Sequence, residues 1–187
     1  MINDDLFYLI NNGLSNPFLD VVMPIISDLG SFEFLAIFCV VIIVISSKRL
    51  LNRQDIKKFA ILAFASLLLS GLIVFVIKIA IQEPRPYLLL SHVKLLSATT
   101  DPNAFPSGHT SSICSIVFLI VFESKKRLSG RNLALIIFAF IIGFSRIYIG
   151  LHFPFDVLVG AVIGIIGAFI VYKLDKSKKF NKIIENV

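Results

Sequence analysis

Two residues near the C-terminal end of the chain could carry out nucleophilic chemistry. His152 lies between Gly150, which can end one helix, and Pro154, which can start the next, so we expect it in a tight turn. Asp156 follows in the first turn of the second helix, where its carboxylate can accept the Nδ1 proton of His152. That contact would leave Nε2 free as a nucleophile. Taken alone, the pair could instead form a solvated turn at a membrane interface.

A second motif, Pro106-Ser107-Gly108-His109, stands at the start of a predicted helix. Ser107 is a suitable N-cap, Gly108 permits close backbone approach, and the free N–H groups of a helix start attract an anion. His109 in the first turn would lie beside that anion, placed to protonate a leaving oxygen. The alternative for this motif by itself is an ordinary capped helix whose histidine meets lipid headgroups.

Three cations complete the set of candidate site residues. Lys78 and Arg85 are close in sequence. Pro84 and Pro86 should end the helix, so we expect Arg85 to reach back toward Lys78 from an extended segment. Arg146 lies in the same stretch as the candidate nucleophile. Three positive charges match a phosphate dianion or a pyrophosphate, and they can stabilise the oxygens of an in-line displacement. Lys78 alone could equally be a lysine whose ammonium group reaches the membrane surface.

The composition of the chain indicates that a membrane-embedded scaffold positions these residues. Of 187 residues, 57% are hydrophobic and only 16% are charged, with a mean hydropathy of +0.90. Five segments are apolar and long enough to cross a bilayer, near 32–47, 58–82, 107–123, 131–149 and 154–174. The sequence therefore predicts an all-α, multi-pass membrane helical bundle of about five spans, forming a single domain over residues 1–187.

The first 31 residues do not fit a span, because acidic residues, Pro17, Pro24 and Gly13 interrupt their apolar character. We expect two short amphipathic helices there, lying at the membrane interface. The segment also has no Lys or Arg, so the basic start of a secretory signal peptide is not found.

The distribution of positive charge predicts the orientation in the membrane. Fourteen of the 18 Lys and Arg residues fall in the first and third loops between spans and in the C-terminal tail. These are Lys48, Arg49, Arg53, Lys57, Lys58, Lys125, Lys126, Arg127, Arg131, Lys173, Lys176, Lys178, Lys179 and Lys182. The positive-inside rule makes this side cytoplasmic, so we expect the N-terminus and the candidate site to be extracytoplasmic and the C-terminus cytoplasmic. Short basic clusters without interleaved aromatic residues argue against a nucleic-acid partner.

The three candidate stretches resemble the signature of the type-2 phosphatidic acid phosphatase superfamily, whose pattern is KxxxxxxRP, then PSGH, then SRxxxxxHxxxD. The matching residues are Lys78 to Arg85-Pro86, Pro106 to His109, and Ser145-Arg146 to His152 and Asp156. Every defined residue of the superfamily pattern is present in this sequence. The helices predicted on either side of the three stretches agree with the resemblance.

This resemblance implies a membrane enzyme that removes phosphate from a lipid. His152 would be the nucleophile that forms a phosphohistidine, Asp156 the carboxylate that orients it, and His109 the general acid. The phosphoryl oxygens would be held by Lys78, Arg85, Ser107, Gly108 and Arg146. Members of the superfamily work without a metal, so no cofactor is expected, although Zn²⁺ held by His109, His152 and Asp156 is an alternative.

Within the superfamily, the short chain and the compact segment between residues 86 and 105 look most similar to the small bacterial undecaprenyl pyrophosphate phosphatases. The resemblance then implies hydrolysis of a polyprenyl pyrophosphate to the monophosphate at the outer membrane face. Alternatives are a phosphatidate or phosphatidylglycerophosphate phosphatase, a lipid phosphotransferase and a non-catalytic lipid-binding protein. Gly160 and Gly164 form a GxxxG step, which predicts either a dimer face or packing within the bundle, so monomer and dimer both stay open.

Overall fold

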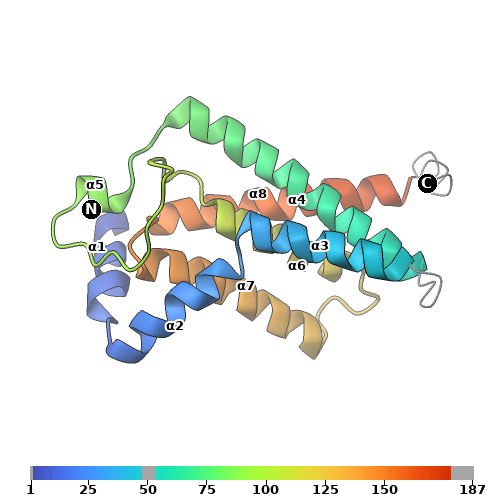
Figure 1. The fold of residues 1–187 in the computed structure, drawn as a ribbon, viewed down its shortest axis with the longest axis horizontal. Coiled ribbons are helices and arrows are strands. Elements are labelled where there is room, and N and C mark those ends of the chain that lie inside the picture. Colours follow the sequence, from blue (N-terminus) through green and yellow to red (C-terminus); the bar gives the residue numbers. More distant parts are fainter. Residues whose placement is uncertain (1, 48–53, 178–187) are drawn as a thin grey trace.

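The computed structural model describes residues 2–47 and 54–177, which are almost entirely helical. The elements are α1 (Ile2–Tyr8), the π-helix η1 (Leu9–Gly13), α2 (Pro17–Asp28), α3 (Phe32–Ser47), α4 (Gln54–Ile81), α5 (Pro86–Leu89), α6 (Gly108–Glu123), α7 (Gly130–Tyr148) and α8 (Pro154–Asp175). The long helices run roughly side by side, and α1, α2 and α5 gather at one end (Figure 1). The predicted all-α bundle is confirmed. We call the end that carries α1, α2 and α5 the site end, and the other the opposite end.

By length and composition alone, fewer of the described helices qualify as candidate spans than the five expected from the sequence. In the described part of the chain, α4, α7 and α8 are long and apolar enough, with 28, 19 and 22 residues. α2 and α3, bent by 52° at their junction, could form one further, broken span. α6 has only 16 residues, which is about 24 Å of helix against a hydrocarbon thickness of about 30 Å. By length and composition, the described residues thus contain three, or up to four, candidate spans, and α6 is a shorter apolar helix beside them.

The short helix α6 is the polar centre of the bundle. It packs against α8, α4 and α7, and its hydroxyl residues Thr110, Ser111, Ser112 and Ser115 are all buried. The hydroxyl of Ser115 donates to the backbone of its own helix, and Ser66 of α4 donates to the carbonyl oxygen of Ser115 at 3.2 Å. Polar groups in an apolar bundle need such internal partners, and small side chains let the helices approach closely. The expected position of this segment inside the bundle agrees with these contacts.

The two glycines of the GxxxG step in α8 face α6 within the same chain. A Cβ added at Gly160 would lie 2.5 Å from the carbonyl oxygen of Ser107, and one added at Gly164 would lie 2.8 Å from the Cβ of Cys114. Neither position has room for a side chain, because the backbones of α8 and α6 are in direct contact. Of the two uses predicted for this step, packing within the bundle is the one seen in the structure.

The N-terminal segment folds back onto the site end through polar contacts. Asn16 caps α2 by accepting a hydrogen bond from Leu19 N at 3.0 Å. The side-chain amide of Asn11 donates to the carbonyl oxygens of Lys94 and Tyr148 at 2.8 and 2.7 Å. The short helices expected in this region are present, and Asn11 ties them to the rest of the chain. Their position at a membrane interface stays a prediction.

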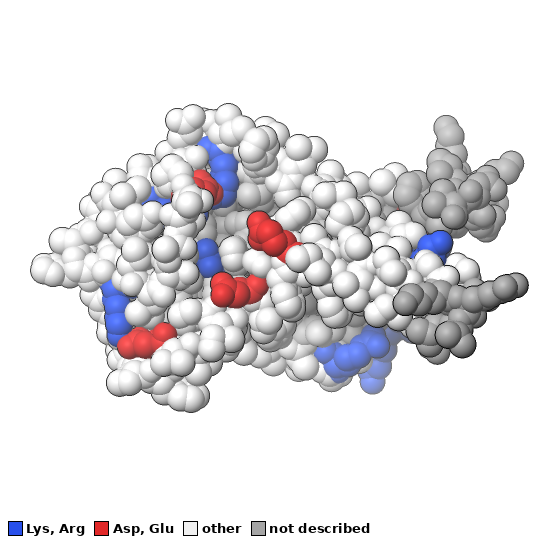
Figure 2. All heavy atoms as spheres, viewed as in Figure 1, with Lys and Arg blue, Asp and Glu red and all other residues white. Residues whose placement is uncertain are grey.

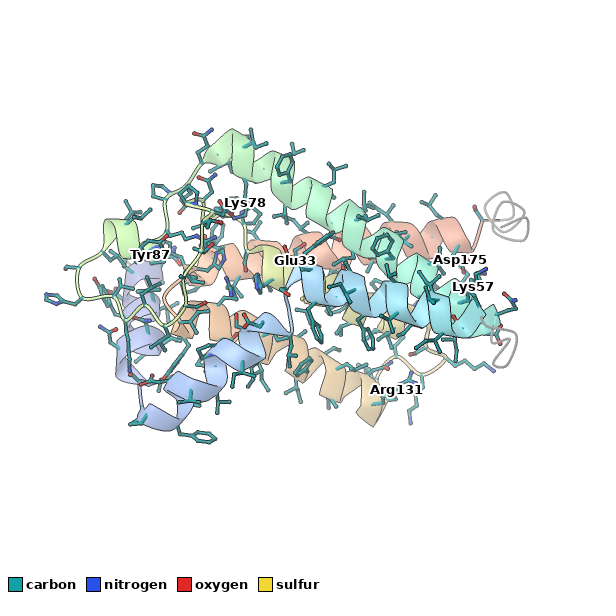
Figure 3. All side chains as sticks on the ribbon, viewed as in Figure 1. Glu33, Lys57, Lys78, Tyr87, Arg131 and Asp175 are labelled. Atoms are coloured by element: carbon teal, nitrogen blue, oxygen red, sulfur yellow. The ribbon has the colours of Figure 1, made fainter. Side chains whose placement is uncertain are left out.

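Charged side chains lie at both ends of the bundle. Figure 3 places Lys78 near the site end of α4 and places Lys57 and Asp175 at the opposite end. There Asp175 is buried and pairs with Lys58 at 2.8 Å. Six of the cations used to predict the orientation lie outside the described residues, namely Lys48, Arg49, Arg53, Lys178, Lys179 and Lys182. The orientation itself stays a prediction.

We predict that Gly160→Ala destabilises the protein by about 1–3 kcal/mol, the usual cost of overpacking a close contact. The added methyl group would meet the backbone of Ser107, which cannot move without shifting α6. Gly130→Ala is the matched control, because nothing lies within 4 Å of a Cβ at that position. The measurement is thermal unfolding in detergent. Equal unfolding temperatures for the two variants would contradict the proposed close contact between α8 and α6.

Candidate active site

The turn between α7 and α8 holds His152 in a defined position. Gly150 ends α7 with φ of +86°, and a Cβ there would lie 2.7 Å from the carbonyl oxygen of Lys94. The carbonyl oxygen of Arg146 then accepts hydrogen bonds from the backbone N–H groups of Leu151 and His152, both at 3.2 Å. His152 is only 2% exposed. Because the backbone of the turn is tied on both sides, the imidazole has a fixed location at the site end.

Asp156 lies in the first turn of α8, next to His152. Its Oδ2 is 3.4 Å from Nδ1 of His152 and accepts a hydrogen bond from Phe153 N at 2.8 Å. The distance to the imidazole is longer than a normal hydrogen bond, and Nδ1 has no hydrogen-bond partner among the described residues. Catalytic hydrogen bonds are often long before substrate binds. The expected His152–Asp156 pair is therefore adjacent but not closed.

Arg85 contacts the other nitrogen of the same imidazole. Its Nη1 is 3.2 Å from Nε2 of His152 and donates to the carbonyl oxygen of Leu151 at 2.9 Å. A guanidinium group has donors and no acceptor, so Nε2 must present its lone pair to Arg85. The proton of a neutral His152 is then on Nδ1, which faces Asp156. This tautomer is the one in which Nε2 can act as a nucleophile.

The Pro106–His109 stretch is bonded directly to the start of α8. The backbone N–H of Ser107 donates to the carbonyl oxygen of Asp156 at 3.0 Å, and the rings of Phe105 and Phe155 stack with centroids 5.9 Å apart. Ser107 occupies the N-cap position of α6, but its side chain makes no capping bond. Its hydroxyl accepts instead from Thr110 Oγ1 at 3.0 Å. The expected side-chain cap is therefore absent, and the N–H groups of the helix start keep their capacity to bind an anion.

Gly108 and His109 line a pocket of about 460 Å³ between α3, α4 and α6. Most of its other lining residues are apolar, among them Phe32, Leu72 and Phe75. His109 is half-buried at this boundary between the polar site and the apolar helices. A headgroup could therefore meet His109 while its hydrocarbon chain lies among apolar side chains.

Lys78 and Arg85 meet at a carboxylate that the sequence did not single out. Nζ of Lys78 lies 2.7 Å from Oδ2 of Asp101 and donates to the carbonyl oxygen of Asn103 at 2.5 Å. Nε of Arg85 donates to the carbonyl oxygen of Asp101 at 2.7 Å. Asp101 and Asn103 belong to the segment between α5 and α6, residues 90–107, which we call the α5–α6 loop. Figure 3 shows Lys78 beside this loop.

Arg146, the third cation, is held by the N-terminal segment. Its Nη1 donates to the hydroxyl of Ser27 at 2.5 Å, and Ser27 is the last residue but one of α2. Nε of Arg146 is buried and has no hydrogen-bond partner among the described residues. A buried donor without a partner is costly, so this N–H is available to a ligand oxygen.

The charges at this site act on one another. Burial, followed by the charges of Arg146 and Arg85, lowers the pKa of His152 well below its usual value. Burial likewise lowers the pKa of Arg85, and the charge of Asp101 opposes this shift. For Asp101, burial raises the pKa, but the hydrogen bonds from Lys78 and from Asn103 N, with the charges of Lys78 and Arg85, lower it overall. On the visible face, basic and acidic side chains lie close together near this end (Figure 2).

The structure thus brings most of the predicted site residues into contact or electrostatic range. Arg85 and Asp156 touch His152, the charges of Lys78, Arg146 and His109 act on its imidazole, and Ser107 is bonded to Asp156. Gly108 lies next to His109 in the pocket wall. Among the described residues, no group of three or more His, Cys, Asp or Glu side chains is arranged to hold a metal ion.

Sequence reasoning missed Asp101, Ser27 and Asn11. Asp101 and Ser27 bind the predicted cations directly, and Asn11 fixes the loop and the end of α7 that meet at the His152 turn. Asp101 carried one usable signal, because it is an acidic residue in the segment that precedes the second motif. Ser27 and Asn11 carried none, since their partners are 119 and 137 residues away.

Comparison with known proteins places this chain in a family. The PAP2 superfamily matches residues 59–180. The chain is 29% identical to "Undecaprenyl-diphosphatase BcrC" of Bacillus subtilis (strain 168) over 92% of this chain and 83% of that protein. The crystal structure of Aquifex aeolicus LpxE is similar with a TM-score of 0.70 and 32% identity, over 92% of this chain and 96% of that one. A PAP2-type phosphatidylglycerolphosphate phosphatase from Bacillus subtilis gives a TM-score of 0.75 at 25% identity, over 94% and 85%.

The superfamily match covers more than half of the chain, and it includes each predicted site residue from Lys78 to Asp156. Both solved structures share the fold over more than nine-tenths of the chain. The resemblance drawn from the three motifs is therefore confirmed, and the chain belongs to the PAP2 superfamily, as a membrane lipid phosphatase.

Proposed function

We propose that this protein hydrolyses an undecaprenyl-type pyrophosphate to the monophosphate through a phosphohistidine on His152. The main support is the position of the His152 imidazole between Arg85 and Asp156. Nε2 of His152 accepts from Arg85 at 3.2 Å while Nδ1 faces Asp156. The Nε2 lone pair is thus available for attack on phosphorus once the substrate phosphate takes over the Arg85 guanidinium.

The chemistry would proceed in two displacements. In the first, Nε2 of His152 attacks the terminal phosphorus, the bond from phosphorus to the bridging oxygen breaks, and His109 gives its proton to that oxygen. The lipid monophosphate leaves. In the second, His109 takes a proton from water, the resulting hydroxide attacks the phosphohistidine, and inorganic phosphate is released with Nε2 restored. Asp156 stabilises the positive imidazole while phosphorus is attached.

The cations and the start of α6 would hold the phosphoryl oxygens during both steps. Nε of Arg146 is a buried donor without a partner, and the first N–H groups of α6 lack a side-chain cap from Ser107. Arg85 would turn from Nε2 to the phosphate as the substrate enters. Donors fixed in advance, in a site that excludes water, are the main source of stabilisation for the charge of such a transition state.

The names of the relatives support a lipid substrate with a phosphorylated headgroup, but they specify different lipids. The similarity to an undecaprenyl-diphosphatase over most of both chains favours the polyprenyl pyrophosphate. The structural similarity to a phosphatidylglycerolphosphate phosphatase supports phosphatidylglycerophosphate as the second candidate. The apolar pocket beside His109 suits the chain of either lipid. Transfer of the phosphoryl group to another lipid would use the same phosphohistidine, and it differs from hydrolysis only in the acceptor.

The predicted orientation places this reaction at the extracytoplasmic face. Lys78 lies near the site end, and Lys57 and Arg131, from two of the three basic segments, lie away from it (Figure 3). The positive-inside rule would then make the opposite end cytoplasmic. We accordingly expect the substrate to be a lipid exposed in the outer leaflet.

We expect the purified protein to release inorganic phosphate from undecaprenyl pyrophosphate in detergent with EDTA present. His152→Asn should reduce release to background, because Asn lacks the imidazole nitrogen that attacks phosphorus in the proposed mechanism. The matched control is His92→Asn, which changes an exposed histidine of the α5–α6 loop and should keep full activity. The measurement is phosphate release from a panel that also contains phosphatidate and phosphatidylglycerophosphate. Activity that survives His152→Asn would refute the proposed mechanism, and labelled phosphate found on a lipid instead of in solution would identify a phosphotransferase.

The role of His109 as general acid can be tested separately. His109→Ala should slow hydrolysis of the lipid by about 10²–10⁴-fold, the usual range for removal of a general acid. With p-nitrophenyl phosphate the loss should be much smaller, because that leaving group needs no proton. The comparison of kcat for the two substrates is the measurement. Similar losses on both would contradict proton donation and point to a role in binding.

Burial of His152 predicts a specific dependence of stability on pH. Its folded pKa is lowered, so below about pH 6.5 the unfolded chain takes up a proton that the folded protein does not. This destabilises the folded state increasingly as the pH falls from about 6.5. Between pH 7.5 and 5, wild type should lose up to about 2 kcal/mol relative to His152→Gln, which lacks this titration. The measurement is thermal unfolding of wild type and His152→Gln at both pH values. If the difference in stability between the two proteins is the same at pH 7.5 and pH 5, His152 is protonated in the folded protein and the prediction is wrong.

A further inference from the structure

The carboxylate of Asp101 occupies the space between two of the predicted phosphate-binding cations. Its Oδ2 lies 2.7 Å from Nζ of Lys78 and 3.5 Å from Nη2 of Arg85. The Asp101 side chain is 43% exposed, whereas those of Lys78 and Arg85 are 14% and 4% exposed. The carboxylate therefore approaches the two cations from the open side of the site, which is also the side from which a ligand anion could come.

The two oxygens of this carboxylate have separate partners. Oδ1 accepts from the backbone N–H of Asn103 at 2.9 Å, which shapes the α5–α6 loop locally. The same loop is fixed to the end of α4 by a hydrogen bond from Ala104 N to the carbonyl oxygen of Glu83 at 2.7 Å. Oδ2 alone binds the cations. The charge on Oδ2 can therefore be removed without removing the bond that shapes the loop.

The three cations of the site differ in what they bind. Arg146 is held by the neutral hydroxyl of Ser27, whereas Lys78 and Arg85 share the negative charge of Asp101. Like charges held close together away from water repel one another, and a carboxylate between two of them relieves part of that repulsion. A phosphate brings more charge and more acceptor oxygens than a carboxylate, so it can replace Asp101 on both cations.

We propose that Asp101 is a resident anion that the phosphate of the substrate must displace from Lys78 and Arg85, and that returns when inorganic phosphate leaves. This inference rests on the proposed function. It explains how the same site avoids retaining inorganic phosphate, the product of the reaction. Asp101 is a positioning residue in this account, because it acts through the two cations and not on phosphorus. Its presence weakens the binding of phosphate.

Asp101→Asn is the informative change. The amide oxygen can still accept from Asn103 N, but the amide nitrogen that replaces Oδ2 is a donor and cannot bind Lys78 or Arg85. Lys78 and Arg85 then lose their shared negative partner and keep only bonds to neutral backbone carbonyl oxygens, so an anion no longer has to displace a carboxylate. Inorganic phosphate should inhibit lipid hydrolysis at about fivefold lower concentration than in wild type, the ratio expected for loss of one partly exposed ion pair. Damage to the site would have the opposite effect and raise the inhibition constant.

The experiment measures inhibition of purified, detergent-solubilised enzyme by inorganic phosphate, with thermal unfolding as the check on folding. The matched control is Asp55→Asn, an exposed carboxylate at the far end of α4, which should keep the wild-type inhibition constant. Asp101→Glu, which retains the charge, should return the constant toward wild type. An unchanged or raised constant in Asp101→Asn would overturn the proposal.

A second neutral variant, Asp101→Ser, guards against a folding failure, since its hydroxyl can also accept from Asn103 N. If neither variant folds, the carboxylate is structural and the proposal is wrong. The proposed function fails in a different way, since wild type itself would then release no phosphate from any lipid of the panel. An active wild type whose phosphate inhibition does not change on removing the charge would refute only the role of Asp101.

Discussion

The burial of three positive side chains at one end of an apolar bundle is the constraint on which this structure depends. Arg85 and Arg146 are almost fully inaccessible and Lys78 is mostly buried, where desolvation and mutual repulsion are both unfavourable. The chain offsets this with backbone carbonyl groups, the hydroxyl of Ser27 and the carboxylate of Asp101. The arrangement favours an incoming anion, and it also suppresses protonation of the imidazole that lies among the cations.

Rigidity of the site comes from backbone bonds between separate stretches. Ser107 is bonded to Asp156, Ala104 to Glu83, and Leu96 to Ile149, at 3.0, 2.7 and 3.1 Å. The direct contact between Gly160 of α8 and Ser107 at the start of α6 also holds these two stretches together. Because each stretch contributes one part of the site, a displacement of any helix would separate nucleophile, acid and cations. The same contacts explain why α6 can be short, since it is surrounded by other helices and need not meet lipid at both ends.

The fold class and the residues of the three motifs could be predicted from the sequence, whereas the supporting contacts could not. Apolar segments mark helices, but they do not say whether 16 residues of α6 cross a bilayer or end inside a bundle. Ser107 had the residue type of an N-cap, yet its hydroxyl binds Thr110 instead. The place of a helix in the bundle depends on neighbouring helices that are distant in sequence. Residue type alone does not identify those neighbours.

By itself the sequence determined the chemistry that is possible, because a histidine followed one helical turn later by a carboxylate, with a second histidine at a helix start, is a local property. It also determined the membrane setting through hydropathy. Only the tertiary structure decided which tautomer His152 adopts, which cations share Asp101, and that Ser27 holds Arg146. Those outcomes depend on distances between residues far apart along the chain, and only the packing of the helices sets such distances.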